Sequence, residues 1–184
     1  HFPDVSFVGM EPAVKPAAET TKTGKVGVLA TPATFQGALY ASVVERFGAG
    51  VELFQHTCPG LVAQIEKGDL DSQETREILE NALHPMLEKN IDTVVLGCTH
   101  YPFVIPLIEQ IVGGNVRVID PAPSVARQAK RLLEANEMTN ESGQPARIQL
   151  FTSGEAASMK SLLPLLLGMN AEVESVTWKE DREI

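Results

Sequence analysis

The chain has 184 residues and a formal net charge of -9, with 24 acidic side chains against 15 lysines and arginines. This balance argues against nucleic-acid binding, because phosphate contacts need clustered positive charge. Hydrophobic residues make up 43% of the sequence, which is enough for a core and too much for a disordered chain. The length suits one α/β domain with a remnant of another.

Cysteine content and hydropathy indicate a protein of the cell interior. The two cysteines, Cys58 and Cys98, are too few for the disulfide framework of a small secreted domain. No stretch approaches the roughly 18 apolar residues that span a bilayer, and no signal peptide is visible. We therefore expect a cytoplasmic protein without a membrane partner. Because residues 1–8 show no capping or targeting pattern, we expect the chain to start inside a larger protein.

Short β-rich runs alternate with helical patterns along the chain. The predicted strands are rich in Val, Ile and Leu and cover residues 5–8, 25–30, 51–55, 93–97, 116–119, 148–151 and 173–178. The predicted helices cover residues 35–47, 72–89, 103–112 and 124–135, with Ser72 and Ser124 as N-caps. This alternation predicts βαβ units on a parallel sheet. A polar linker, residues 137–146, precedes a last strand–helix–strand piece.

The segment with the most chemical content is residues 96–102, Leu-Gly-Cys-Thr-His-Tyr-Pro, at the end of an apolar strand. Ligands of open α/β sheets bind beyond the carboxyl ends of the strands, so Cys98 stands where a reactive group would be. A helix beginning after it would offer N–H groups to a thiolate or an anionic substrate. His100 could assist proton transfer, and Thr99 adds a hydroxyl donor. The alternative is a small core residue, a common role for a cysteine after a buried strand.

A second polar cluster, residues 55–60, follows another predicted strand and contains His56 and Cys58. We interpret Cys58 as a buried structural thiol. Glu66 follows on a short predicted helix. Together with the residues around Cys98, these side chains lack the CxxC or HExxH spacing of zinc sites, so we expect no metal.

A third cluster, residues 30–34, lies between a strand and a helix and contains Thr31 and Thr34. Thr34 is a plausible N-cap of the helix. The two hydroxyls and the neighbouring N–H groups could also hold a substrate carboxylate. The sequence leaves both roles open.

Five segments, in order and with matching spacing, resemble bacterial glutamate racemases of the aspartate/glutamate racemase family. They are LGCTHYP at 96–102, GMEPAVKPA at 9–17, GVLATPAT at 27–34, CPGLV at 58–62 and VIDPA at 118–122. The resemblance runs from about residue 5 to about residue 135 and is weak beyond about residue 147. It implies the fold of that family, in which two similar α/β domains enclose the active site.

The resemblance also implies a reaction without pyridoxal phosphate or metal. In the family, one thiolate removes the α-proton of glutamate and a second thiol protonates the opposite face, giving D-glutamate for peptidoglycan. Cys98 matches the thiol that deprotonates L-glutamate. His100 and Glu66 match positions credited with assisting catalysis, and Thr99 would help to hold the substrate. The chemistry agrees, because inversion needs an acid and a base on opposite faces at once in a closed, water-poor cleft.

The sequence departs from the family pattern in one large respect. We find neither the Asp-Ser pair nor the Cys-Asn-Thr motif of the first half, which bears the other thiol. Cys58 cannot replace that thiol, since it lies on the same half as Cys98. We therefore expect residues 1–122 to form the second α/β domain and residues 123–184 to be a remnant that packs with the missing first domain. Alone, the chain should not racemise glutamate.

Other functions compete with this interpretation. An aspartate or hydantoin racemase belongs to the same class, but the EPAVKPA stretch and the His after Cys-Thr favour glutamate. A non-catalytic module could instead bind an acidic amino acid or a nucleotide-sugar regulator, or serve as an interaction domain. A homodimer could place two Cys98 thiols face to face, because the two domains of the family are pseudo-symmetric.

Overall fold

The computed structural model describes residues 5–10, 12–140, 142–145 and 147–177. These residues form two compact units. The first falls within His1–Ile65 and Asp69–Thr139, and the second within Glu66–Gly68 and Asn140–Ile184. Among the described helices, none combines the length and apolar character that a bilayer crossing demands.

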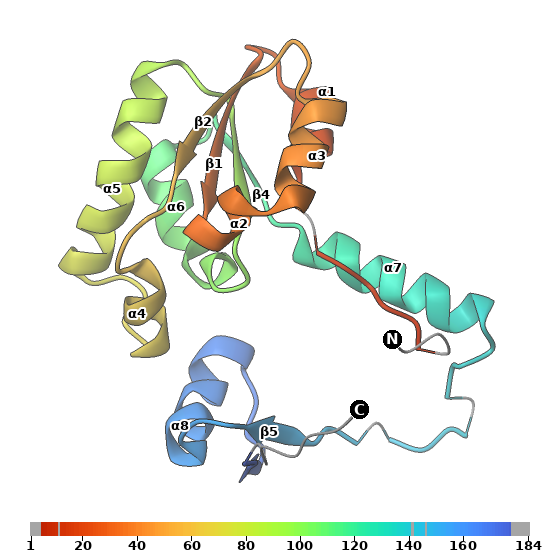
Figure 1. Ribbon diagram of the computed structural model, residues 1–184. Coiled ribbons are helices and arrows are strands. Elements are labelled where there is room, and N and C mark those ends of the chain that lie inside the picture. Colours follow the sequence, from red (N-terminus) through yellow and green to blue (C-terminus); the bar gives the residue numbers. More distant parts are fainter. Residues whose placement is uncertain (1–4, 11, 141, 146, 178–184) are drawn as a thin grey trace. The chain divides into compact units, whose positions relative to one another are not determined.

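The first unit is built on a four-stranded parallel sheet in the order β2-β1-β3-β4 (Figure 1). Its strands are β1 (Lys25–Ala30), β2 (Glu52–His56), β3 (Thr93–Gly97) and β4 (Arg117–Ile119). The chain steps from β1 to β2 on one side and then returns to place β3 on the other side of β1. The carboxyl ends of β1 and β3 therefore flank the point where the winding direction reverses, which is where open α/β sheets bind ligands.

Seven α-helices and one short 3-10 helix accompany the described part of this sheet. They are α1 (Val14–Thr20), α2 (Pro32–Gln36), α3 (Ala38–Phe47), α4 (Leu61–Glu66), α5 (Gln73–Glu88), η1 (Tyr101–Val104), α6 (Ile105–Val112) and α7 (Ala122–Ala135). Helices α1 and α3 lie on one face of the sheet, and α5 and α6 on the other (Figure 1). This arrangement confirms the predicted α/β class with its parallel sheet.

Both faces of β1 and β3 are buried, which explains their near-continuous apolar sequences. On the α1 and α3 face, buried residues form one core cluster: Val14, Ala17, Val26, Val28, Ala30, Tyr40, Val43, Val95 and Ile119. Each large apolar side chain buried there contributes about 1.5–3 kcal/mol. On the opposite face, a Cβ at Gly27 would lie 2.8 Å from Met86 Sδ. The glycine therefore lets α5 pack close to the central strand.

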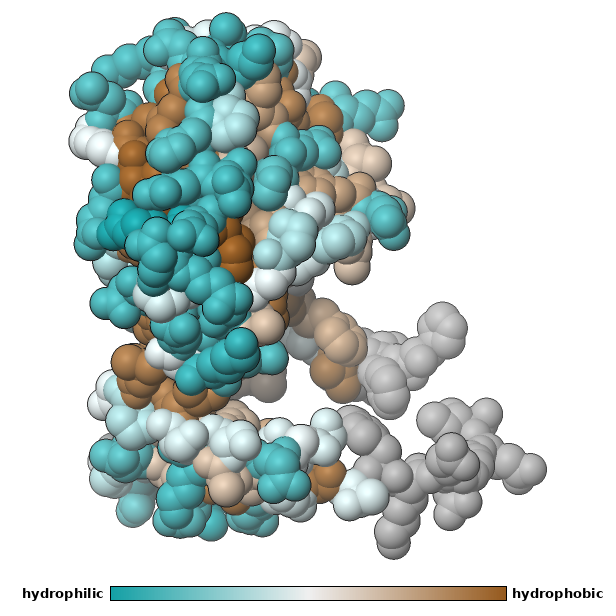
Figure 2. Space-filling model, turned by 90° about the vertical axis from the view of Figure 1, so that its left-hand side faces the viewer, coloured by the Kyte–Doolittle hydropathy of each residue, from teal (hydrophilic) through white to brown (hydrophobic). Residues whose placement is uncertain are grey.

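Helix α5 shows how local sequence and packing agree. Its N-cap is Ser72, as predicted, whose side chain accepts a hydrogen bond from the N–H of Thr75. Leu79, Leu83 and Met86 lie on its buried side. The surface over this helix is largely hydrophilic (Figure 2), as expected for an amphipathic helix at the surface.

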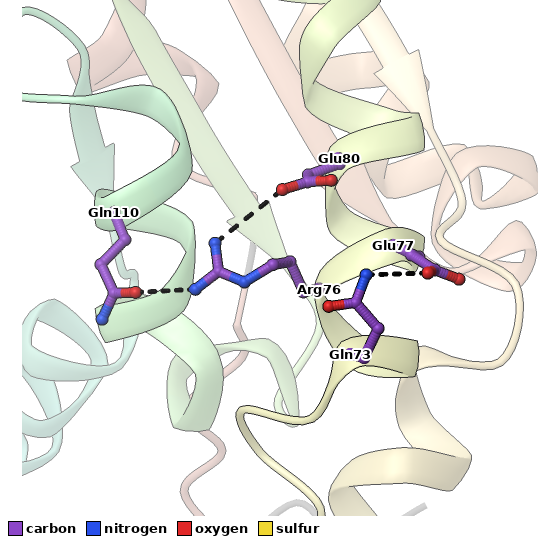
Figure 3. Close-up of polar contacts among 5 residues, drawn as sticks. All are labelled: Gln73, Arg76, Glu77, Glu80 and Gln110. Atoms are coloured by element: carbon purple, nitrogen blue, oxygen red, sulfur yellow. Dashed lines mark hydrogen bonds and ion pairs between the residues drawn. The ribbon is translucent and has the colours of Figure 1, made fainter.

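A polar contact joins α5 to α6 at the surface. The Arg76 guanidinium donates to Gln110 Oε1 at 2.9 Å and lies 3.8 Å from Glu80 Oε1 on its own helix (Figure 3). Gln73 donates to Glu77 at 2.8 Å one turn away. Because α6 follows η1 directly, this contact helps to fix the segment that leaves the carboxyl end of β3.

The second unit contains a parallel pair of short strands and one helix. These are β5 (Leu150–Thr152), β6 (Val173–Ser175) and α8 (Ala156–Leu167). Helix α8 ends at Leu167 and is followed by Gly168, whose φ of 63° is the left-handed conformation typical of a glycine after a helix. The assignment of residues 123–184 to the remnant of another domain stays a prediction. In the structure, the boundary between the two compact units in this part of the chain falls after Thr139.

Several predicted boundaries are wrong. Residues 5–8 form no strand, because no strand of the described residues pairs with their backbone groups. The predicted helix 35–47 is two helices, α2 and α3, with extended backbone at Gly37 between them. Helix α7 begins at Ala122 and not at a cap on Ser124, since proline is tolerated in a first helical turn. Strand β6 stops at Ser175, and Trp178 lies outside the described residues.

Candidate functional site

The candidate site lies at the carboxyl end of the sheet, where the chain leaves β1 and β3. In the register of these strands, Ala30 pairs with Gly97. Thr31 and Cys98, the next residue of each strand, therefore emerge side by side from adjacent strands. The structure brings the first and third predicted clusters together, although 67 positions separate Thr31 from Cys98 in the sequence.

Gly97, the residue before Cys98, packs closely against Ala30 and Pro12. A Cβ at this position would lie 2.9 Å from Ala30 Cβ and 3.4 Å from Pro12 Cγ. Its carbonyl accepts a hydrogen bond from Thr34 Oγ1 at 3.1 Å. Because real Cβ atoms do not approach as closely as 2.9 Å, only glycine fits here without a shift of the backbone.

Cys98 lies at the tip of β3 with its sulfur beside His100. The distance from Cys98 Sγ to His100 Nδ1 is 3.9 Å. Thr99 between them is exposed, and His100 is half-buried. Cys98 itself is only 6% exposed, which is less than its place at the carboxyl end of a strand led us to expect. Its burial fits a protected reactive group as well as a core residue, so the assigned roles of these three residues stay predictions.

Tyr101 has no role predicted from the sequence, but in the structure it is only 1% exposed. Its hydroxyl donates to the Thr57 carbonyl at 2.9 Å and so joins the loop after β2 to the loop after β3. Burial raises the pKa of Tyr101, with a smaller contribution from the nearby Cys58 and Cys98. The only signal in the sequence is an aromatic residue with a hydroxyl directly after the Cys-Thr-His run.

Cys58 lies in the loop that Tyr101 contacts. It is 2% exposed and has a φ of 44°, a conformation that costs a non-glycine residue roughly 1–3 kcal/mol. Its N–H donates to His56 Nδ1 at 3.1 Å. Burial, followed by the proximity of Cys98, raises the pKa of Cys58 to about 12. A thiol that keeps its proton in this way agrees with the interpretation of Cys58 as structural.

The two threonines of the third cluster hold the start of α2. The N-cap is Thr31, whose side chain accepts from the N–H of Thr34, so the prediction of Thr34 as the cap is wrong. The helix starts earlier than expected because Pro32 suits its first position. The two hydroxyls lie 3.1 Å apart. A role for them in holding a substrate carboxylate stays a prediction.

Glu66 is exposed and ends α4. It belongs to the second compact unit, whereas Cys98 and His100 belong to the first. Its assistance to catalysis therefore stays a prediction. Within the described residues, no three His, Cys, Asp or Glu side chains gather as a metal ion would require.

A cavity of about 740 Å³ lies elsewhere in the first unit, between α1, α3 and the β4–α7 turn. Its lining includes Lys15, Arg46 and Arg127 together with Asp120. Neither Cys98 nor His100 is among the described residues that line it. The cavity therefore provides no substrate volume beside the candidate thiol.

Comparison with known proteins identifies the family of the chain. Residues 2–129 match the Asp/Glu/Hydantoin racemase family. A glutamate racemase from Pseudomonas paraeruginosa (strain DSM 24068 / PA7) is 46% identical over 172 residues, which cover 94% of this chain and 64% of that protein. One from Pseudomonas aeruginosa (strain UCBPP-PA14) is 47% identical over 167 residues, covering 91% of this chain and 63% of the relative.

Solved structures give the same result. Glutamate racemase isoform RacE1 from Bacillus anthracis superimposes with a TM-score of 0.77 at 28% identity, over 89% of this chain and 61% of that one. Escherichia coli glutamate racemase, in complex with L-glutamate and the activator UDP-MurNAc-ala, gives 0.73 at 28% identity, over 91% and 63%. The chain spans a little under two thirds of the length of these relatives.

The matched residues 2–129 include the whole four-stranded sheet and the Cys98 loop. The resemblance expected from the five sequence segments is therefore confirmed. The chain belongs to the Asp/Glu/Hydantoin racemase family.

Proposed function

We propose that this chain carries one thiol base of a cofactor-independent glutamate racemase, with Cys98 removing the α-proton of L-glutamate. The observation that carries the proposal is the 3.9 Å contact between Cys98 Sγ and His100 Nδ1, at a strand end of a racemase-family sheet. An imidazole beside a thiol can accept or relay its proton, so the pair has the parts of a general base.

Glutamate as the substrate is supported by the relatives. The Escherichia coli protein, 28% identical, was solved with L-glutamate bound. Thr99 is exposed next to the thiol, and Thr31 emerges from the adjacent strand. Hydroxyls are suitable partners for the amino and carboxylate groups of an amino acid. In this role, these threonines and Thr34 hold the substrate, and its D-isomer supplies peptidoglycan synthesis.

Inversion needs a proton donor on the opposite face of the α-carbon. Cys58 is poorly suited to that role, because it is 2% exposed and belongs to the same compact unit as Cys98. We therefore propose that this chain alone exchanges the α-proton without inverting the centre. Complete racemisation then requires a second thiol from outside the first unit, and Glu66 with His100 assists the proton transfer.

One observation favours a different function. The 6% exposure of Cys98 is also what a non-catalytic module would show if it retained the family fold only to bind an acidic amino acid. Such a module binds glutamate but transfers no proton, so isotope exchange separates the two functions.

The deciding experiment incubates the purified chain with L-glutamate in D₂O. Mass spectrometry measures deuterium at the α-carbon, and chiral chromatography measures D-glutamate. We expect deuterium in L-glutamate without D-glutamate. Cys98→Ser should lower the exchange rate by roughly 100-fold or more, because a serine hydroxyl is a far weaker acid than a thiol.

Cys58→Ser is the matched control and should keep the exchange rate within about threefold, since that thiol touches no substrate in the proposal. Glutamate binding without exchange in the unmodified chain would support the binding module instead. D-glutamate formation that disappears in Cys98→Ser and persists in Cys58→Ser would overturn the need for a second thiol.

A further inference from the structure

The turn that carries Cys98 is held from two sides by neutral hydroxyl groups. On one side, Thr34 Oγ1 donates to the carbonyl of Gly97 at 3.1 Å. On the other side, the Tyr101 hydroxyl donates to the carbonyl of Thr57 at 2.9 Å. Cys98 lies between the two anchored positions in the sequence. Its place therefore depends on both hydrogen bonds.

The Tyr101 contact joins two loops that leave strands which are not neighbours in the sheet. Thr57 follows β2 and Tyr101 follows β3, but β1 lies between these two strands. The ladder hydrogen bonds of the sheet therefore cannot fix these two loops to each other. A side chain that bridges over the end of β1 fixes both, and Tyr101 is long enough and rigid enough to do so.

The loop after β2, whose Thr57 carbonyl accepts this hydrogen bond, has a conformation that needs such a constraint. Cys58, directly after Thr57, has the left-handed φ of 44°. A non-glycine residue keeps such a conformation only when its surroundings determine it. The N–H of Cys58 bonds to His56 and its carbonyl accepts from the N–H of Leu61. The hydrogen bond from Tyr101 to the Thr57 carbonyl is a third contact that holds this loop.

The Tyr101 hydroxyl also suits a site where protons move. Burial, with the nearby Cys58 and Cys98, raises its pKa. It therefore stays protonated through neutral pH and can donate its hydrogen bond whether or not a neighbouring thiol is ionised.

We infer that Tyr101 is a positioning residue for Cys98: its buried hydroxyl, bonded to the Thr57 carbonyl, fixes the turn from β3 into η1 that presents the thiol. The phenol itself touches no substrate in this arrangement. The inference rests on the proposed role of Cys98 in glutamate racemisation, and its test has a readout that needs no turnover.

The test compares Tyr101→Phe with Tyr40→Phe in the full chain. The sequence has two tyrosines, and both are buried and hydrogen-bonded through the hydroxyl. Tyr40 accepts from the Gln55 amide at 3.0 Å and belongs to the α1 and α3 core. Each variant keeps its ring and loses one hydroxyl, so the pair separates loss of this particular bond from loss of a buried hydroxyl in general.

The first readout is the rate of alkylation by iodoacetamide, measured for each cysteine by peptide mass spectrometry. We expect Tyr101→Phe to raise the rate at Cys98 roughly tenfold, the size that one lost buried hydrogen bond allows. Amide hydrogen exchange should quicken in residues 56–60 and 97–101 and stay unchanged in α5. Tyr40→Phe should leave the rate at Cys98 within about twofold.

The second readout is α-proton exchange into L-glutamate. Tyr101→Phe should lower the maximal rate about tenfold and leave KM within about twofold, because the phenol positions the base and does not bind substrate. If no variant exchanges the proton, the proposed function fails while the alkylation data still decide the role of Tyr101. Equal alkylation and equal local exchange in the two tyrosine variants would overturn the inference.

Discussion

The two ends of the four-stranded sheet hold their loops with different kinds of groups. At the amino end, the Asp92 carboxylate accepts hydrogen bonds from Thr21 Oγ1 and the N–H of Lys22, both at 2.6 Å, and from the N–H of Thr23 at 2.9 Å. Thr93 Oγ1 donates to it at 3.1 Å. Around Cys98 at the carboxyl end, the neutral hydroxyls of Thr34 and Tyr101 donate to backbone carbonyls.

A carboxylate has a different effect at each end of the sheet. An ionised carboxylate is a strong acceptor, and at the amino end it ties the α1–β1 loop to the start of β3. A fixed negative charge beside a thiol would oppose ionisation of that thiol. Thr34 and Tyr101 hold the loops around Cys98 without adding charge. The carboxylate that stabilises the amino end therefore lies at the opposite end of the sheet from Cys98.

The largest expected effect on stability comes from the carboxyl end. Gly97→Ala places a Cβ 2.9 Å from Ala30 Cβ and should lower the free energy of unfolding by about 2 kcal/mol. Urea denaturation followed by circular dichroism measures this change. Gly114→Ala is the matched control, because nothing lies within 4 Å of its Cβ position. Equal stabilities of the two variants would show that the close contact with Ala30 does not limit packing.

A smaller effect, with a pH dependence, is expected at the amino end. Partial burial raises the pKa of Asp92, but the hydrogen bonds to its carboxylate outweigh this and lower the pKa to about 2, from an ordinary value of 3.8. The depressed pKa means that this stabilisation is complete above about pH 4 and is lost as the pH falls toward 2. Asp92→Asn should cost about 1 kcal/mol at pH 7, after allowance for solvent screening.

Urea midpoints at pH 7 and at about pH 2.5 check this prediction. The difference between the unmodified chain and Asp92→Asn should shrink at the lower pH. Asp71→Asn, at an exposed carboxylate, serves as the control and should change little at either pH. A difference that stays constant with pH would mean that charge on Asp92 does not stabilise the amino end.

The smallest effect is expected at the surface contact between α5 and α6. Arg76→Ala removes the contact to Gln110 on α6 and the 3.8 Å approach to Glu80. Its side chain is 34% exposed, so the loss should be about 0.5 kcal/mol, seen as a small fall in Tm. Lys130→Ala, whose pair with Glu134 is more exposed, should change Tm even less. A loss above about 1.5 kcal/mol would mean that the α5–α6 contact matters as much as the sheet ends.

Much of the fold could be predicted from short-range patterns. The strands β1 and β3 are apolar on both faces, and Ser72 caps α5, so local sequence was enough to define them. The break at Gly37 could not be predicted, because residues on both sides of it have helical spacing. Pairing of short segments such as residues 5–8 depends on which strands lie next to them, which is a property of the whole sheet.

In the candidate site too, contacts between residues close in sequence could be predicted, and contacts between distant residues could not. Cys98 and His100 are two residues apart, so their proximity follows from the sequence. The bond from Tyr101 to Thr57 joins positions 44 residues apart and depends on the strand order. The placement of Glu66 depends on an arrangement of two compact units, which local patterns do not determine.

Because Gly27 has no side chain, the Met86 side chain occupies the space beside it, and the sizes of residues 27 and 86 are linked. With Met86 Sδ only 2.8 Å from where a Cβ would stand, a larger residue at position 27 requires the side chain at position 86 to shift or to be smaller. Relatives with a bulkier residue in the middle of this strand should therefore carry a smaller side chain on the helix opposite, so that the two sites change together during evolution.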